Sequence, residues 1–381
     1  MVMPKKPSLL YISPVIPALT GNGLAMRAGT VLEVLAQRHD LHLLVVPLYA
    51  SVTPRLPEPL EKMCRRAEIA SPRQRQRGGL LPAGIWGVPR FDVVHVFRLA
   101  TLPFSRPYLG RLFRRPRRHL DLDDIESLTH RRLASLYRQN GDSAMAAREE
   151  SEAARCETRE DEVLRTFDRV YVCSASDRSR LAGRARADLR VLLNGVRMPA
   201  NVPARPAGEV FTFLFVGTLG YYPNEDAVRF LCAEILPRLR ELAGDKFVVN
   251  IVGTGASESL RQAASVAGVR FIGPVADLGP WYAQSHAIVA PIRAGGGTRI
   301  KILEAFSYRR PVVATSMAME GIDAHADEHA VIGDTSAAFA QQCARLMADG
   351  DLCDRLARNA LDLVEQRYSL QALRRALEEM P

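Results

Sequence analysis

Glycines, two cations and an acid that could bind a phosphorylated ligand lie together between residues 291 and 315. The run Gly295-Gly296-Gly297-Thr298 precedes Arg299 and Lys301, and Glu304 follows one helical turn later. Glycines let backbone N–H groups approach an anion closely, and the open amides of a helix N-terminus carry about half a positive charge. We therefore predict an anion site, followed by a carboxylate that can accept hydrogen bonds from ligand hydroxyls.

A glycine run is also common in plain mobile turns, and this alternative stays open from the sequence alone. The spacing differs from the GxxxxGK[ST] pattern of P-loop proteins and from the GxGxxG pattern of dinucleotide-binding domains. A P-loop kinase and a conventional dehydrogenase are therefore disfavoured.

A second group of acids occupies residues 121–127, which read DLDDIES. Carboxylates crowded at the carboxyl end of a strand repel one another and usually serve a ligand, a metal or a helix cap. For Asp123 and Asp124, capping of the next helix and contact with a ligand both remain open. His95 lies in an apolar strand pattern, which favours a core histidine.

Strand-like and helix-like segments alternate around these residues, which favours parallel sheets covered by helices. In the first half we predict strands at residues 9–12, 41–46, 93–96, 120–122 and 170–172, and helices over 24–37 and over 127–165 with a break near residue 140. In the second half we predict strands at 211–216, 247–252, 269–272, 287–291 and 312–314, and helices over 223–242, 257–267 and 281–285. Residues 54–87 are rich in Pro, Arg and Gly and predict an irregular insertion.

The pattern PxxxGGGTRxKxLEAxxxxxPVVAT over residues 291–315 resembles the donor-binding signature of GT-B glycosyltransferases, particularly glycosyltransferase family 4. The resemblance implies that the glycine turn and its helix hold a diphosphate and that Glu304 binds the ribose. It also implies the GT-B fold, in which two Rossmann-like α/β domains face a central cleft. We predict an acceptor-side domain over 1–195, a proline-rich linker over 196–209, a donor domain over 210–365, and a C-terminal helix over 366–381 that packs back on the first domain.

Other positions carry the same resemblance. Gly217 and Thr218 are similar to the turn that lines the pyrophosphate and sugar in the family, and Gly253 is similar to the next turn. Val275 lies in the segment whose backbone reads the base in relatives. For Gly217 and Thr218, a plain strand-to-helix turn is the alternative.

The sequence departs from the family pattern in two places. Many relatives carry an Arg and a Lys after the first turn of the donor domain, whereas residues 219–224 read LGYYPN here, so we infer that Arg299 and Lys301 carry that charge. Relatives also place a glutamate eight residues before the one matched by Glu304, and this chain has Gly296 there.

In the first half, the loop with Gly21, Asn22 and Gly23, followed by Arg27, resembles the glycine-containing loop that meets the donor diphosphate and the acceptor. Many relatives have a sugar-contacting histidine near residues 121–127. Here Asp123 or Asp124 would accept a hydrogen bond from the acceptor hydroxyl or stabilise positive charge on the sugar.

These expectations describe a metal-independent glycosyltransferase without a cofactor, which uses a nucleotide-diphosphate sugar, most simply a UDP- or GDP-sugar, and retains anomeric configuration. The acceptor would be a glycan or a lipid-linked saccharide. Two alternatives remain: a nucleotide-sugar epimerase or phosphorylase of the same fold, and an inactive protein that binds a nucleotide sugar or nucleic acid. No RNA-binding signature of the RRM kind supports the nucleic-acid alternative.

Composition fits this class. The 381 residues are enough for two domains, 47% of them are hydrophobic, and no run of apolar residues is long enough to predict a membrane span or a signal peptide. The chain has a net charge of +9, and the basic excess lies in the first 200 residues, where 33 Lys and Arg outnumber 21 Asp and Glu and where 73–77 and 111–118 are arginine clusters. Such clusters suit an anionic membrane surface or remain plain solvated faces, and we expect a cytoplasmic protein, at the inner face of a membrane in the first case. The six scattered cysteines predict reduced structural thiols.

Overall fold

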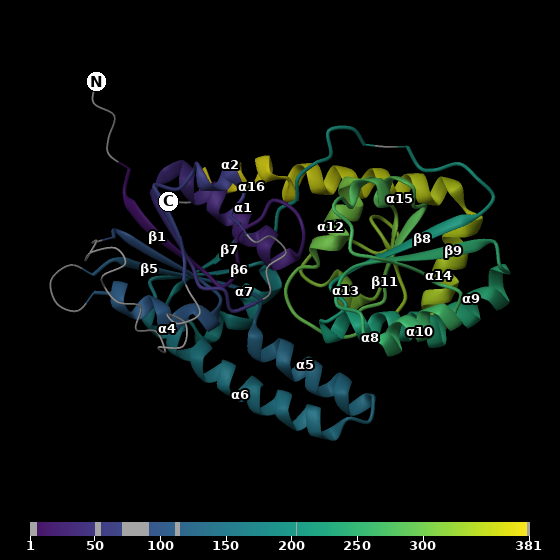
Figure 1. Ribbon diagram of the computed structural model, residues 1–381, viewed down its shortest axis with the longest axis horizontal. Helices are drawn as coiled ribbons and strands as arrows, with labels where there is room; N and C mark the ends of the chain where they lie inside the picture. Colours follow the sequence, from purple (N-terminus) through teal and green to yellow (C-terminus); the bar gives the residue numbers. More distant parts are fainter. Residues whose placement is uncertain (1–5, 50–54, 71–90, 111–114, 203, 379–381) are drawn as a thin grey trace. The chain divides into compact units, whose positions relative to one another are not determined.

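The computed structural model describes residues 6–49, 55–70, 91–110, 115–202 and 204–378. The chain forms two compact units (Figure 1). The first holds residues up to His130, then Arg148–Asn194 and the end of the chain from Ala376; the second holds Arg131–Ala147 and Gly195–Arg375. Each unit carries its own parallel sheet, as predicted for two Rossmann-like α/β domains.

The first unit is built on a sheet with the strand order β3-β2-β1-β4-β5-β6-β7, in which the described pairs are parallel. Its strands are β1 Ser8–Ser13, β2 Asp40–Val45, β3 Arg66–Ile69, β4 Val93–Phe97, β5 Arg117–Asp123, β6 Arg169–Val172 and β7 Asp188–Val191. Its helical segments are α1 Gly23–Arg38, α2 Glu58–Glu61, η2 Leu99–Thr101, α4 Leu102–Ser105, η3 Arg106–Tyr108, α6 Ser143–Thr166, α7 Ala175–Leu181 and η4 Ala182–Arg184, with the start of α5 Glu126–Gln139.

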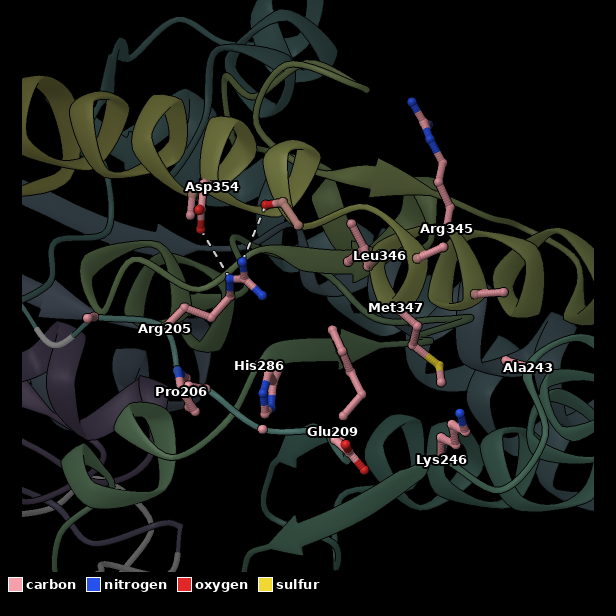
Figure 2. Close-up of a pocket in the computed structure, with 18 of the residues that line it drawn as sticks. Arg205, Pro206, Glu209, Ala243, Lys246, His286, Arg345, Leu346, Met347 and Asp354 are labelled. Carbon is pink, nitrogen blue, oxygen red and sulfur yellow. Dashed lines mark hydrogen bonds and ion pairs between the residues drawn. The ribbon is translucent and has the colours of Figure 1, made fainter.

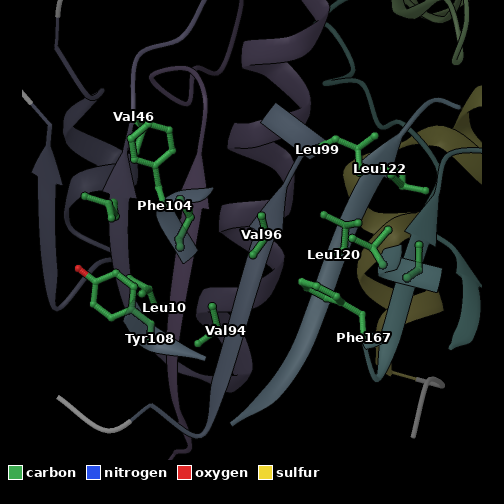
Figure 3. Packing of buried hydrophobic residues seen from close by; sticks show 14 of the residues in the cluster. Leu10, Val46, Val94, Val96, Leu99, Phe104, Tyr108, Leu120, Leu122 and Phe167 are labelled. Atoms are coloured by element: carbon green, nitrogen blue, oxygen red, sulfur yellow. The ribbon is translucent and has the colours of Figure 1, made fainter. Parts of the chain in front are cut away.

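The central strands of this sheet are apolar on both faces because helices cover both sides. Leu10 and Ile12 point into one core and Leu9 and Tyr11 into the other, as the two-residue period of a strand requires. Figure 3 shows the first of these cores, in which side chains from β1, β4 and β5 pack with Phe104, Tyr108 and Phe167.

One prediction for this unit is wrong. Part of the segment predicted as an irregular insertion, residues 54–87, folds as α2 and β3, and β3 extends the sheet by pairing with β2 from His42↔Arg66 to Val45↔Ile69. The polar composition fits an edge strand, where only one side of the backbone is paired. Residues 71–87 of that prediction lie outside the described part of the chain.

The second unit repeats the architecture with the strand order β10-β9-β8-β11-β12-β13. Its strands are β8 Phe211–Val216, β9 Phe247–Val252, β10 Arg270–Gly273, β11 Ala287–Ala290, β12 Val312–Ala314 and β13 Val331–Ile332. Its helices are α8 Tyr222–Phe230, the π-helical η5 Leu231–Ile235, α9 Leu236–Ala243, α10 Glu258–Val266, α11 Gly279–Ala283, α12 Ile300–Ser307, α13 Ser316–Met319, α14 Ser336–Ala348, α15 Gly350–Leu363, the π-helical η6 Val364–Tyr368 and α16 Leu370–Glu378. Within the described residues, no helix is both long and apolar enough to cross a bilayer.

The strand order places a topological switch point in each sheet. In the second unit the chain runs outward from β8 through β9 and β10, and then returns to the other side of β8 as β11. Ligands of doubly wound sheets bind beyond the carboxyl ends of the strands at such a point. The loops after β8 and β11 are therefore the places to look for a ligand.

The long charged stretch predicted over residues 127–165 forms the helical hairpin of α5 and α6, broken at Asn140–Asp142 as expected (Figure 1). Near its base, the two helices are joined by the Ser127 hydroxyl, which donates to Glu160 at 2.6 Å, and by His130 and Glu149 at 2.6 Å. The tip, Arg131–Ala147, belongs to the second unit, although more than 45 residues of the first unit follow it in the sequence.

Candidate functional site

The residues predicted to bind the donor follow four neighbouring strands of the second unit. Gly217 and Thr218 follow β8, Gly253 follows β9, and Val275 follows β10, while the glycine run follows β11. Parallel strands end at the same edge of their sheet, so all four loops lie at its carboxyl edge. The fold therefore brings the predicted donor-binding residues to one edge of the sheet, with Gly217, Thr218 and the glycine run at the switch point between β8 and β11.

The first two turns pack so closely that they require glycine. A Cβ atom on Gly253 would lie 1.8 Å from the carbonyl oxygen of Gly217. A Cβ on Gly217 would lie 3.0 Å from both Asn224 Cγ and Lys301 Nζ. Because glycine has no Cβ atom, the backbones of the β8 and β9 turns can contact each other beside Lys301.

The glycine run exposes three successive backbone donors. The N–H groups of Gly296, Gly297 and Thr298 have no hydrogen-bond acceptor within the described part of the chain. Thr298 is 8% exposed, and its hydroxyl also lacks a partner there. A buried hydroxyl without a partner is rare in folded proteins, so the Thr298 hydroxyl and the three open N–H groups beside it are together suited to an anionic ligand.

Arg299 is the residue immediately before α12, and its guanidinium folds back over the loop without capping the helix. It donates to the carbonyl oxygens of Gly296 and Gly297. In this conformation Arg299 shapes the loop and adds positive charge next to it.

Lys301 lies in the first turn of α12 and points towards the β8 turn. Its ammonium donates to Asn224 Oδ1 at 2.7 Å and lies 4.7 Å from the centre of the Phe215 ring. Asn224 in turn donates to the carbonyl of Thr218 at 2.9 Å. Burial, with a smaller effect of Arg299, lowers the pKa of Lys301 to about 7.

Glu304 lies one turn further along α12 and accepts a hydrogen bond from the Tyr282 hydroxyl at 3.4 Å. Burial raises the pKa of Glu304 to about 7, against the opposing effects of Tyr282 and Lys301. A carboxylate beside the anion site is thus placed to accept hydrogen bonds from hydroxyl groups of the same ligand.

In the first unit, the predicted loop residues are largely engaged in structure. Gly21 has a φ of 110°, and Asn22 caps α1 by accepting from Ala25 N at 2.9 Å, so α1 begins at Gly23. Arg27 is 2% exposed and binds Asp121 through two hydrogen bonds of 2.7 and 3.1 Å. It also donates to the Leu192 carbonyl, so Arg27 is a buried structural residue that links α1 to β5 and to Leu192.

Asp123 and Asp124 form a cluster with an arginine that sequence reasoning missed. Arg98, directly after β4, contacts Asp123 at 3.4 Å, Asp124 at shorter range and Glu126 at 3.2 Å. Arg98 and Asp123 both have positive φ, 69° and 62°, which is uncommon for residues with a side chain and often marks functional sites. Burial raises the pKa of Asp123 to about 6, although Arg27 and Arg98 oppose it.

His95 is a core residue, as its strand pattern predicted. It is 1% exposed and stacks on Tyr171 with ring centres 5.5 Å apart, and burial lowers its pKa to about 3. The arginine cluster at 73–77 and residues 111–114 of the second cluster lie outside the described residues.

A cavity of about 1050 Å³ lies at the opposite edge of the second sheet (Figure 2). Its lining includes Phe211 and His286, which stand at the amino ends of β8 and β11, together with Lys246, just before β9. Arg205 binds Asp354 at 3.1 Å across it. None of the predicted donor-binding or acceptor-side residues lines this cavity, so the cavity is separate from the glycine loop.

Three residues of the second unit contact the predicted site without having been predicted: Asn224, Tyr282 and Arg132. Asn224 lies in α8 and Tyr282 in α11, where a polar or aromatic residue is ordinary, so their types gave little signal. Arg132 is 163 residues away from Gly295, to whose carbonyl it donates at 3.0 Å. Such a contact exists only in the folded chain.

Comparison with known proteins supports the same interpretation. Residues 210–349 match the family model of group 1 glycosyl transferases. The structure is similar to sucrose-phosphate synthase from Thermosynechococcus elongatus, with 14% identity, 98% of each chain covered and a TM-score of 0.73. It is also similar to Anabaena HepE in complex with UDP-glucose, with 15% identity, 98% of each chain covered and a TM-score of 0.69.

A third similar structure is WaaG, a glycosyltransferase involved in lipopolysaccharide biosynthesis, with 13% identity, 97% of this chain and 98% of that chain covered, and a TM-score of 0.64. A search of curated protein sequences finds no significant match. The matched residues include the turns after β8, β9 and β10 and the glycine run with α12. The chain thus has the GT-B fold, and its residues 210–349 match the model of group 1 glycosyl transferases.

Proposed function

We propose that this protein is a glycosyltransferase that moves a sugar from a nucleotide-diphosphate sugar to an acceptor hydroxyl, with retention of anomeric configuration. The observation that carries the proposal is the set of unpartnered donors at the start of α12: three backbone N–H groups and the buried Thr298 hydroxyl. Their place at the switch point of a group 1 domain supports a diphosphate as their ligand.

The electrostatics support leaving-group stabilisation. Cleavage of a sugar–phosphate bond places negative charge on the departing diphosphate, and fixed N–H groups stabilise that charge without reorganising. Lys301, held by Asn224, adds a cation when protonated, and Arg299 contributes positive charge from behind the loop. We assign the ribose hydroxyls to Glu304, the nucleotide phosphates to the turns at Gly217, Thr218 and Gly253, and the base to the backbone at Val275.

We further propose that the acid cluster of the first unit serves the acceptor. Asp123, whose pKa is raised to about 6, can accept a proton or a hydrogen bond from a hydroxyl near neutral pH. Arg98 and Asp124 would hold Asp123 in its strained conformation. A glycan or a lipid-linked saccharide is the proposed acceptor. HepE, whose structure holds UDP-glucose, supports a UDP-sugar donor, and WaaG, which is involved in lipopolysaccharide biosynthesis, supports an envelope glycan.

The test is release of nucleoside diphosphate from a panel of UDP- and GDP-sugars, measured with and without glycan and lipid-linked acceptors. Acceptor-dependent release together with a new glycoside of retained configuration is the expected result. A changed sugar in the nucleotide pool without acceptor would favour an epimerase. Binding without any turnover across the panel would favour an inactive binder and contradict the proposal.

A further inference from the structure

The tip of the α5–α6 hairpin, Arg131–Ala147, lies against the glycine loop within the second unit. Leu133 and Leu136 of the tip are buried in one cluster with Ala294, the residue immediately before Gly295. We propose that Arg132 is a positioning residue that orients this loop for a diphosphate. The proposal rests on the nucleotide site proposed above. It adds the hairpin tip to that site, although this segment falls within the predicted acceptor-side domain.

Arg132 is held in a fixed orientation by Glu320. Its guanidinium makes two hydrogen bonds to that carboxylate, of 2.5 and 2.9 Å, and the Arg132 side chain is 17% exposed. The same nitrogen that binds Glu320 at 2.5 Å also donates to the Gly295 carbonyl at 3.0 Å. A planar guanidinium can hold a carboxylate and a carbonyl at once, whereas the ammonium of a lysine lacks this fork geometry.

The carbonyl that Arg132 holds determines where the next N–H group points. In a trans peptide the C=O of one residue and the N–H of the following residue point in opposite directions, and the described chain has no cis peptide bond. Arg132 on the Gly295 carbonyl therefore turns the Gly296 N–H away from itself. Arg299 acts in the same way on the next two peptides, so two arginines fix all three unpartnered N–H groups.

Further contacts anchor the helix that carries Arg132. Tyr137 stacks on Tyr222 of α8, with ring centres 3.9 Å apart and planes 6° from parallel. Asn140 donates to Asp226 at 2.8 Å, and Asp226 is also bound by Arg293 at 2.6 and 2.9 Å. Asn140 also accepts a hydrogen bond from Arg293 at 3.3 Å, so Tyr137 and Asn140 attach the tip to α8 and to Arg293, whereas Arg132 holds the Gly295 carbonyl. Different mutations can therefore remove these two sets of contacts.

The experiment compares nucleotide with nucleoside binding. Isothermal titration of the full chain with UDP and uridine, and with GDP and guanosine, isolates the affinity that the phosphates add. For Arg132→Ala we expect the affinity for the nucleoside diphosphate to fall by about tenfold, the effect of misplacing one charged-ligand hydrogen bond, with the nucleoside affinity unchanged. Arg132→Lys and Glu320→Gln, which disturb the fork more gently, should each give a smaller loss of the same kind.

Asn140→Ala is the matched control, because it removes the hairpin contacts to Tyr222, Asp226 and Arg293 and leaves the hydrogen bond to the Gly295 carbonyl in place. It should bind UDP or GDP like the wild type. An equal loss in Asn140→Ala would overturn the assignment to Arg132, as would unchanged diphosphate affinity in both Arg132 variants with the wild type binding normally. If the wild type itself bound neither UDP nor GDP, the nucleotide site would fail as well, which is a distinct result.

Discussion

Lysine is ordinarily a cation, but Lys301 is buried between Asn224 and the Phe215 ring, which lowers its pKa. Its charge in the folded protein should therefore depend on whether an anionic ligand is bound. Its pKa of about 7 means that the free protein holds Lys301 largely neutral at pH 8. A bound diphosphate favours the ammonium form and should raise that pKa. The residue would then bind a proton together with the nucleotide.

We predict that binding of one UDP at pH 8 takes up about half to one proton. Because binding then consumes protons, the affinity for UDP should fall as the pH rises above about 7. Isothermal titration in buffers with different ionisation enthalpies measures the proton count. Glu304, with a pKa also near 7, is mostly ionised at pH 8 and contributes little there. Lys301→Met should abolish the uptake, and a wild-type protein that binds UDP with no proton uptake would contradict the role of Lys301.

Arg27 illustrates the opposite outcome, because a residue predicted for the ligand loop is buried in a structural ion pair. Truncation would leave Asp121, which is 0% exposed, without its guanidinium partner. We expect Arg27→Ala to lower the free energy of unfolding by about 3–5 kcal/mol, as for other broken buried pairs. Urea denaturation measures this change.

Arg65→Ala is a suitable comparison, since Arg65 pairs with Asp40 at 3.1 Å but is 67% exposed. Exposed ion pairs contribute about 1 kcal/mol or less, so this variant should remain near wild-type stability. Equal free energies of unfolding for the two variants would show that the buried Arg27–Asp121 pair does not stabilise the fold.

At the scale of elements, the β8 and β9 turns depend on the absence of side chains. The 1.8 Å approach between a Cβ on Gly253 and the Gly217 carbonyl leaves no room for alanine unless one turn moves. We predict that Gly253→Ala destabilises the fold by about 1–3 kcal/mol, as in other overpacked sites, and weakens UDP binding because the Gly217 turn is displaced.

Gly220, in the turn after β8, provides the matched substitution. A Cβ there would meet nothing closer than the Gly255 carbonyl at 3.6 Å, an ordinary contact. Gly220→Ala should therefore keep both stability and UDP affinity, as measured by urea unfolding and titration. Similar behaviour of the two alanine variants would rule out close turn packing as the reason for glycine.

At the scale of the whole molecule, each unit closes its own core, and the cysteines are distributed through both. All six are free; five are buried and Cys64 is half-buried. Burial raises the pKa of Cys64 and of Cys156 to about 12, and that of Cys232 and of Cys353 to about 11. The thiolate is the form that attacks a disulfide reagent, so these groups should be unreactive while the protein is folded.

We predict slow reaction of the native protein with a disulfide reagent such as DTNB at pH 8, and rapid reaction of six thiols after unfolding in guanidinium. Absorbance of the released thiolate gives the count. A thiol that reacted rapidly in the native protein would show that at least one of the two units opens readily.

The sequence by itself determined the two α/β sheets, most strand positions and the residues after β8, β9, β10 and β11. These features are readable because strand periodicity, glycine turns and the motif over residues 291–315 are local patterns. The tertiary structure alone decided that Arg27 is a buried structural residue, that Arg98 joins Asp123 and Asp124, and that residues 55–70 add a strand to the first sheet. It also decided that the hairpin tip with Arg132 belongs to the second unit. These outcomes depend on partners far apart in the chain and on backbone conformations such as the positive φ of Arg98 and Asp123, which residue types do not specify.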